Sequence, residues 1–128
     1  MKIAKGFLCI IIFIALSECS SVPGRRESNW VGYTESGMAS YYAVNFQLKK
    51  TASGEAYDRF QKTAAHRKLP FGTIVKVTNA KNGKSVIVKI NDRGPFVKGR
   101  IVDLSSSAFS SIAKLDAGVI EVIIEVIK

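Results

Sequence analysis

Branched apolar residues occupy every second position from Ile120 to Val126, near the end of this 128-residue chain. Glu121 and Glu125 stand at positions between them. A period of two residues is that of a β-strand with one buried face. Such a strand needs a sheet partner and a core to cover that face, so the chain is predicted to fold mainly from β-strands.

Turn residues divide the preceding part of the chain into further strands. TIVKVTNA (73–80) and KSVIVKIND (84–92) flank the residues KNG, which predict a hairpin with Gly83 at a position that tolerates positive φ. RIVDL (100–104) predicts a short strand, and GMASYYAV (37–44) predicts the first strand of the domain.

One short helix is expected among these strands. SSSAFSSIAKL (105–115) has a capping serine, Ser105, and places Phe109 and Ile112 on one face. About six strands with one or two short helices predict a small β-barrel of the mainly β class.

The N-terminus has the layout of a secretory signal peptide. Lys2 and Lys5 precede an unbroken apolar run, FLCIIIFIAL (7–16). This run is much shorter than the ~20 apolar residues that span a bilayer. A positive start, a short apolar run and small residues near Ser17 together favour cleavage. An uncleaved signal anchor is the alternative.

The residues that follow, LSECSS (16–21), resemble a bacterial lipobox, with Leu16 three residues before Cys19. The resemblance implies that Cys19 carries a diacylglyceryl group and that residues 1–18 are removed. Glu18 departs from the pattern, which has a small residue at this position. No Asp follows Cys19, and this sorting pattern suggests the outer membrane, with the protein facing the periplasm.

Three segments are therefore expected: a lipoprotein signal peptide (1–18), a polar tether (19–36) and one domain (37–128). Trp30 and Tyr33 are the exceptions in the tether, and we expect them to dock onto the domain as an extra edge. Within the domain, the polar segment from Asn45 to Pro70 is predicted to be a long irregular loop. Loops of this length in compact domains are commonly functional.

The charge of the chain limits its partners. Its net charge is +9, and removal of Lys2, Lys5 and Glu18 with the signal peptide leaves about +8. For an exported protein the available polyanions are lipid head groups, lipopolysaccharide and cell-wall polymer. The basic residues are scattered and form no DNA-binding helix, so nucleic acid is not an expected partner.

The two cysteines, Cys9 and Cys19, both precede the expected domain. The domain should therefore contain neither a disulfide nor a cysteine-based metal site, and no metal or other cofactor is expected. A small exported domain without disulfides must rely on its apolar core.

Asp92 ends the strand KSVIVKIND on its apolar side. Alternation places Val86, Val88, Ile90 and Asp92 on one face, at the rim of the core. A carboxyl group that is partly withdrawn from water favours its protonated form, which is the condition required of a general acid. The alternative is structural: Asp92 pairs with Arg93 or accepts backbone N–H groups of the turn that Gly94 begins.

The long loop offers two further candidates, Glu55 in TASGEAYD and the single histidine of the chain, His66. Each has an ordinary structural interpretation. A glutamate in a polar loop is usually solvated, and a lone histidine is more often a structural residue than a catalytic one.

Five motifs together resemble the rare lipoprotein A family in order and spacing, over nearly all of residues 37–128. They are GMASYYA, TASGEAYD, TAAHRKLPFGT, VKVTNAKNGKSVIVKINDRGPFVKGRIVDLS and GVIEVIIEVI. The resemblance implies a double-psi β-barrel, related in fold to barwin-like endoglucanases and to expansins. It also implies a lytic transglycosylase that cleaves peptidoglycan, preferentially glycan strands without stem peptides, and it places the active-site residues at Glu55, His66 and Asp92.

Two features depart from the family pattern. Ser53 stands where an asparagine is more usual, next to Glu55. The sequence ends at Lys128, directly after the last expected strand, whereas many members continue into a sporulation-related repeat domain. Septal targeting through that domain is therefore not part of what we expect here.

The implied reaction needs one carboxyl group that acts first as acid and then as base. We assign this role to Asp92, which would protonate the glycosidic oxygen between N-acetylmuramic acid and N-acetylglucosamine. The muramic C6 hydroxyl would then attack its own anomeric carbon and form a 1,6-anhydro end. Glu55 would stabilise positive charge or assist the hydroxyl, and His66 would orient a carboxyl group or bind the sugar.

Five further residues are candidates for binding the substrate, and each also has a structural interpretation. Arg93 would meet the lactyl carboxylate of a peptide-free strand, or else pair structurally with Asp103. Four aromatic residues are candidate sugar platforms, with core packing as the alternative for each: Tyr41, Tyr42, Tyr57 and Phe96.

The expected partners are peptidoglycan glycan strands and, through Cys19, a membrane, and the protein is expected to act as a monomer. Two rival functions remain at this point. One is a non-catalytic, expansin-like protein that binds cell-wall glycan. The other is an inverting hydrolase that holds a water molecule between Glu55 and Asp92.

Overall fold

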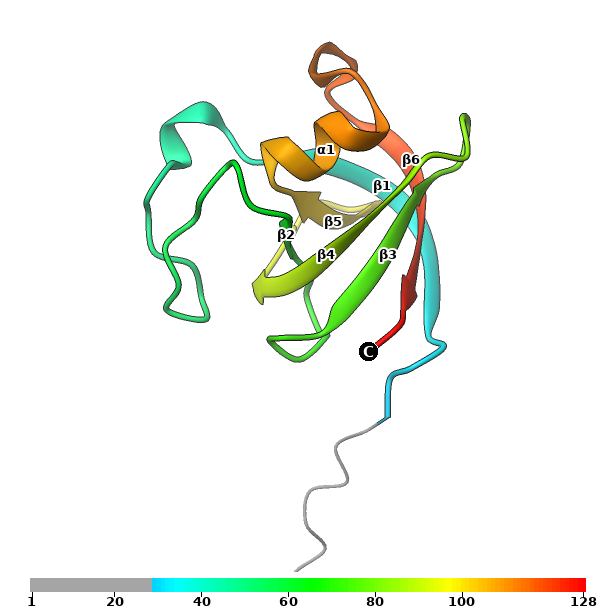
Figure 1. Cartoon of the computed structure of the whole chain (residues 1–128), viewed down its shortest axis with the longest axis horizontal. Coiled ribbons are helices and arrows are strands. Elements are labelled where there is room, and N and C mark those ends of the chain that lie inside the picture. The colour runs from blue at the N-terminus through cyan, green and yellow to red at the C-terminus, as the bar shows by residue number, and fades with distance from the viewer. Residues whose placement is uncertain (1–28) are drawn as a thin grey trace, which may run out of the picture.

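The computed structural model describes residues 29–128 and shows a closed barrel of six strands (Figure 1). The strands are β1 (Thr34–Tyr41), β2 (Thr63–Ala65), β3 (Ile74–Asn79), β4 (Ser85–Asp92), β5 (Arg100–Leu104) and β6 (Ile120–Val126). Three short helices accompany them: η1 (Val44–Phe46), α1 (Ser106–Ile112) and η2 (Leu115–Ala117). The prediction of a small, mainly β barrel is confirmed.

The strands follow one another around the barrel in the order β1-β5-β2-β4-β3-β6. β1 runs parallel to β5, and β2 runs parallel to β4, while the other neighbouring pairs are antiparallel. Parallel neighbours cannot be joined by a tight hairpin and need long crossover connections. The connection from β1 to β2 extends to one side of the barrel as an arm that carries η1 (Figure 1).

Strand β6 closes the barrel between β1 and β3. Its alternation is confirmed, because Val122, Ile124 and Val126 are buried whereas Ile123 is exposed. These buried side chains join those of the other strands and of helix α1 in a single apolar core. A core of this kind holds the domain together without a disulfide.

The parallel pair β1–β5 is closely packed at Gly37. A Cβ atom at this position would lie 2.6 Å from Cγ2 of Ile101 and 3.2 Å from the carbonyl oxygen of Gly99. The backbone N–H of Met38 donates to that same carbonyl at 2.9 Å. Only a residue without a side chain allows this approach of the two strands.

One strand differs from the sequence prediction. The composition of the segment from Asn45 to Pro70 predicts an entirely irregular loop, yet Thr63–Ala65 form β2, and all three residues are buried. β2 lies between β4 and β5. Three short residues carry no hydrophobic periodicity, so their strand conformation comes from their two neighbours and not from a local pattern.

Strand β1 begins at Thr34, within the range that the sequence assigns to the tether. Residues 34–36 pair with β6, and the N–H of Gly32 donates to the carbonyl of Val126 at 2.9 Å. Trp30 and Tyr33 pack against the core, in agreement with the prediction for them.

The predicted helix and hairpin are also confirmed. The Ser105 side chain accepts a hydrogen bond from the N–H of Ala108, and Phe109 and Ile112 are buried. Gly83, in the turn between β3 and β4, has a φ of +73°.

Within residues 29–128, no helix is long and apolar enough to cross a membrane. The predicted signal peptide and the lipidated Cys19 lie outside the described residues.

Candidate active site

The Asp92 carboxylate, at the end of β4, accepts three hydrogen bonds. Its Oδ1 accepts from the backbone N–H groups of Ala52, at 2.8 Å, and of Arg93, at 2.9 Å. Its Oδ2 accepts from the hydroxyl of Tyr42 at 2.6 Å. Asp92 is half-buried at the end of its strand, but the expected alternation breaks just before it. Asn91 is buried next to Ile90, and the register with β2 shifts at this point.

Through Ala52, Asp92 holds the turn that carries Glu55. The N–H of Thr51 donates to the Glu55 carbonyl at 2.8 Å, and the N–H of Ser53 donates to the Asn91 carbonyl at 3.2 Å. The Ser53 hydroxyl accepts from the N–H of Glu55 at 3.3 Å, so this residue takes part in the turn despite its departure from the family pattern. Asp92 and Glu55 are thus brought to the same turn at the end of β4.

The Glu55 carboxylate lies on the surface of this turn. It pairs with Nζ of Lys89, also on β4, at 3.1 Å, and the Lys89 and Glu55 side chains are 41% and 50% exposed. An ion pair with this exposure contributes about 0–1 kcal/mol. Glu55 is therefore held loosely and is open to a ligand.

A stacked pair of tyrosines supports Asp92 from the other side. The rings of Tyr42 and Tyr57 are stacked with centroids 4.3 Å apart, and the Phe46 ring packs edge-on against Tyr42. Burial, followed by the hydrogen bond to Asp92, raises the pKa of Tyr42 well above its ordinary value. Tyr42 is therefore a neutral hydroxyl that donates to Asp92.

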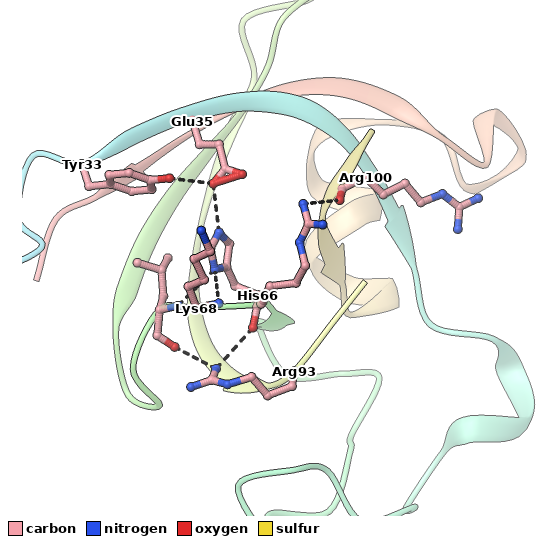
Figure 2. Close-up of polar contacts among 8 residues, drawn as sticks. Tyr33, Glu35, His66, Lys68, Arg93 and Arg100 are labelled. Atoms are coloured by element: carbon pink, nitrogen blue, oxygen red, sulfur yellow. Dashed lines mark hydrogen bonds and ion pairs between the residues drawn. The ribbon is translucent and has the colours of Figure 1, made fainter. Parts of the chain in front are cut away.

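His66 is buried and hydrogen-bonded on both ring nitrogens (Figure 2). Its Nδ1 accepts from the backbone N–H groups of Lys68 and Leu69, at 3.0 and 3.1 Å. Nδ1 consequently carries no proton, so Nε2 carries it and donates to the Glu35 carboxylate at 3.1 Å. The Tyr33 hydroxyl donates to the same oxygen of Glu35 at 3.0 Å.

The His66 side chain orients a carboxylate, which is one of the roles expected for it, but this carboxylate belongs to Glu35. No hydrogen bond joins the imidazole to Asp92 or Glu55 in the described part of the chain. His66 instead meets Asp92 through the backbone, where its N–H donates to the Asp92 carbonyl at 3.1 Å. Sequence reasoning missed Glu35, because it lies in the range assigned to the tether.

The Arg93 guanidinium is bound by other residues of the domain. It donates to the carbonyls of His66, at 3.2 Å, and Leu69, at 2.8 Å (Figure 2). It also lies 4.0 Å from the ring centroid of Phe71. The alternative pairing with Asp103 does not occur among the described residues, where the Asp103 carboxylate accepts a hydrogen bond from Ser40.

The aromatic candidates differ in their environment. Tyr57 is 1% exposed, and its hydroxyl accepts from the N–H of Ser106. Tyr41 packs against Phe109 and donates to the Leu115 carbonyl at 2.8 Å. Phe96, by contrast, is 79% exposed. Of the four candidates, Phe96 has the open ring that a sugar platform requires.

Two open pockets, of about 460 and 630 Å³, lie near α1 and η2, and neither is lined by Asp92, Glu55 or His66. Residues 29–128 contain no group of three or more histidine, cysteine or acidic side chains that could hold a metal ion. The end of β4 brings together two carboxyl groups and a tyrosine hydroxyl, which are groups that suit acid–base catalysis.

The chain is similar in sequence to several proteins that share one name. It is 53% identical over 96 residues to the endolytic peptidoglycan transglycosylase RlpA of Vibrio cholerae, a match that covers 75% of this chain and 36% of that protein. It is 50% identical over 97 residues to the protein of the same name from Campylobacter jejuni, covering 76% and 35%. The matched region thus spans about a third of the length of these relatives.

Solved structures with a similar fold carry other names. The Streptomyces papain inhibitor is 25% identical, with a TM-score of 0.63 over 77% of this chain and 97% of that one. A mutant expansin of Clavibacter michiganensis, solved in complex with cellohexaose, is 22% identical, with a TM-score of 0.60 over 75% and 51%. The family model described as lytic transglycolase matches residues 34–124, which include every strand but the last two residues of β6. This chain belongs to the lytic transglycolase family of RlpA-like double-psi β-barrels.

Proposed function

We propose that this protein is an endolytic lytic transglycosylase that cleaves the bond between N-acetylmuramic acid and N-acetylglucosamine in peptidoglycan. The proposed substrate is a peptide-poor glycan strand, and the proposed product is a 1,6-anhydro-muramic end. The observation that carries the proposal is the position of Asp92 beside the turn that holds Glu55. The names of relatives with about 50% identity support it.

The hydrogen bonds of Asp92 assign different tasks to its two oxygens. Oδ1 is occupied by two backbone N–H groups, which orient the carboxyl group. Among residues 29–128, Oδ2 is hydrogen-bonded only to the Tyr42 hydroxyl, which can donate to a carboxylate and accept from a carboxylic acid. In the proposed mechanism the proton therefore resides on Oδ2, from which it passes to the glycosidic oxygen.

After this transfer, the bond from the anomeric carbon to the leaving oxygen breaks and positive charge develops on the sugar. The C6 hydroxyl of the same muramic acid attacks the anomeric carbon and returns its proton to Oδ2 of Asp92. Glu55, exposed on the adjoining turn, is the carboxylate that we propose stabilises the developing charge. No cofactor takes part in these steps.

His66 acts in this proposal as a positioning residue. His66 directly follows β2. Its backbone N–H donates to the Asp92 carbonyl, and its ring donates to the Glu35 carboxylate on β1. Arg93 supports the same region through the carbonyls of His66 and Leu69. Phe96 is the proposed sugar platform on the strength of its exposure.

A second candidate function is binding of cell-wall glycan without cleavage. The three hydrogen bonds that Asp92 accepts also suit a structural residue that anchors the turn from Thr51 to Glu55. An inverting hydrolase that uses Glu55 and Asp92 is the third candidate, and it differs from the first only in its product.

One experiment separates the three candidates. The chain without residues 1–18 is incubated with peptide-free glycan strands, and the products are analysed by mass. Anhydro ends support transglycosylation, and reducing ends heavier by one water molecule support hydrolysis. Glycan that co-sediments with the protein without being cleaved supports binding alone.

Replacement of Asp92 tests its assigned role. We expect Asp92→Asn to lose about 10²-fold or more of the cleavage rate, because general acid catalysis contributes this much and an amide cannot supply the proton. The amide keeps an oxygen acceptor for the backbone donors, so the circular dichroism spectrum should be unchanged. Asp116→Asn, which changes an exposed carboxylate on η2, is the matched control. Wild-type rates in Asp92→Asn would remove Asp92 from the mechanism.

We further propose that Cys19 is lipidated and that the protein is anchored in the outer membrane, facing the periplasm. The support is the sequence LSECSS after a signal-like apolar run, with no Asp after the cysteine. The proposed protein acts as a monomer on glycan strands, at the distance from the membrane that residues 19–36 allow.

A further inference from the structure

The pocket of about 460 Å³ is formed by the arm that follows β1, by the residues before β2 and by helix α1, which lie on the same side of the barrel (Figure 1). Three of its lining residues are exposed large apolar side chains: Val44, Phe60 and Leu115, at 76%, 71% and 40%. Three serines of α1 also line it: Ser106, Ser107 and Ser110. The pocket therefore presents both apolar surface and hydroxyl groups.

Among the described residues, the only charged side chain in the lining of this pocket is that of Arg59. Its guanidinium lies 4.8 Å from the ring centroid of Phe60. A second cation, Nζ of Lys62, reaches the serine wall and donates a hydrogen bond to the Ser107 hydroxyl. No acidic residue of the described range lines the pocket, so its charge is positive.

Arg59 is available for a ligand, unlike Arg93. In residues 29–128, its guanidinium forms no ion pair with a carboxylate, whereas the guanidinium of Arg93 donates to two backbone carbonyls. A planar guanidinium is suited to bind a carboxylate through two parallel hydrogen bonds. The fold thus leaves Arg59, and not Arg93, free to meet a carboxylate on a substrate.

The pocket is close to the candidate active site. Tyr57 lines the pocket and stacks on Tyr42, and the Tyr42 hydroxyl donates to Asp92. One pair of stacked rings therefore separates the pocket from the carboxyl group that we propose as the acid. A polymer that reaches Asp92 can extend into this pocket with a neighbouring sugar.

We propose that this pocket is a subsite for a sugar that carries a free carboxylate, with Arg59 as the specificity-determining residue. In a glycan strand of the proposed substrate this sugar is N-acetylmuramic acid, whose lactyl carboxylate pairs with Arg59. The Phe60 ring and Val44 contact the apolar parts of the sugar, and the α1 serines bind its hydroxyl groups. A stem peptide in amide linkage would remove this carboxylate, so the subsite selects peptide-poor strands. The inference rests on the proposed function and deepens it.

The test compares two forms of the same peptide-free strands. In one form the lactyl carboxylates are intact, and in the other they are reduced to alcohols. Binding is measured by co-sedimentation, in a buffer of fixed ionic strength, and cleavage is measured by mass. We expect the wild-type protein to bind the intact strands about tenfold more tightly, and Arg59→Gln to bind both forms as the wild type binds the reduced form.

Two further variants control for charge and for geometry. Lys114→Gln removes one exposed positive charge outside this pocket and should keep the tenfold preference. Arg59→Lys keeps the charge without the planar fork and should keep only part of the preference. Arg59 is exposed, so thermal unfolding should show that each variant remains folded.

The proposal is overturned if Arg59→Gln keeps the wild-type preference, or if the wild type does not distinguish the two forms. An equal loss of preference in Lys114→Gln would assign the effect to net charge and would also overturn it. If the wild type shows the Arg59-dependent preference but forms no products, the subsite stands and the catalytic proposal fails. If it cleaves without any preference, only the subsite fails.

Discussion

His66 is buried with a hydrogen bond at each ring nitrogen, and this arrangement favours the neutral imidazole. Two backbone N–H groups point at Nδ1, where an added proton would face them. Burial, as the largest cause, lowers the pKa of His66 below its ordinary 6.5, while Glu35 partly opposes this shift. Arg67 and Arg93 lower the pKa in the same direction as burial.

The lowered pKa of His66 predicts how stability depends on pH. The unfolded chain takes up a proton near pH 6.5, whereas the folded protein does so only at a lower pH. The contribution of His66 is therefore fully present above pH 6.5 and is lost as the pH falls through the folded pKa. The free energy of unfolding should decrease by up to about 1.4 kcal/mol per pH unit in that window because of this residue.

Urea unfolding at about pH 7.5 and about pH 5.5, on either side of the ordinary histidine pKa, measures this effect. We expect His66→Gln, which cannot take up the proton, to lose less stability than the wild type over this interval. The difference between the two losses is the quantity that reports His66. Equal losses in the two proteins would show that the folded and unfolded pKa values of His66 coincide.

At the scale of elements, the contact between β1 and β5 depends on Gly37. This glycine has no positive φ, so the reason for it is the close approach of Ile101 and of the Gly99 carbonyl. The same two strands carry Ser40 and Asp103, whose side chains are hydrogen-bonded, near the end of the barrel where Tyr42 begins the arm.

We expect Gly37→Ala to lower the free energy of unfolding by about 1–3 kcal/mol, the usual cost of overpacking a well-packed core. The added methyl group would stand 2.6 Å from a side-chain carbon and 3.2 Å from a backbone oxygen, and the backbone oxygen cannot move without the strand. Thermal unfolding measures the loss. Ser36→Ala, at the exposed neighbouring position, should unfold at the wild-type temperature.

A double-mutant comparison tests whether contact with Ile101 causes the loss of stability expected for Gly37→Ala. In Ile101→Ala, which lacks the nearer carbon, the same Gly37→Ala change should cost less than in the wild-type chain. An unaltered unfolding temperature for Gly37→Ala in the wild-type background would show that the two strands can separate without cost.

For the molecule as a whole, the proposed site on the barrel is useful only where peptidoglycan is present. The chain enters the barrel beside the end of β6, because Gly32 and Tyr33 are hydrogen-bonded to Val126 (Figure 1). The arm that carries η1 extends from another side of the barrel (Figure 1). The turn of this arm that holds Glu55 is hydrogen-bonded to Asp92 through Ala52. The described chain thus enters the barrel on a different side from the arm.

The proposed anchor predicts that the precursor, expressed in a Gram-negative bacterium, incorporates labelled palmitate and fractionates with the outer membrane. Cys19→Ala should lose both properties, because no other residue at this site provides a thiol for the diacylglyceryl group. Cys9→Ala, which removes the other cysteine of the chain, should keep them. Equal labelling of wild type and Cys19→Ala, or no labelling of either, would contradict lipidation at Cys19.

Local patterns were sufficient for most elements of the barrel. The alternation in β6 determined which of its side chains are buried, Gly83 determined the hairpin, and Ser105 determined the start of α1. These features depend on neighbours within a few residues, so they can be interpreted without knowledge of the fold. The alternation of β4 held from Val86 to Ile90 but broke at the buried Asn91, so it did not by itself determine the position of Asp92.

Only the tertiary structure decided which distant residues meet. β2 has no periodicity of its own and exists because β4 and β5 provide partners on both sides. Glu35 reaches His66 across 31 residues of sequence, and Tyr42 reaches Asp92 across 50. The sequence likewise could not predict that the Arg93 guanidinium binds backbone carbonyls of His66 and Leu69, whereas the Arg59 guanidinium forms no ion pair in the described residues. Such contacts depend on the order and register of the strands, which no short stretch of sequence contains.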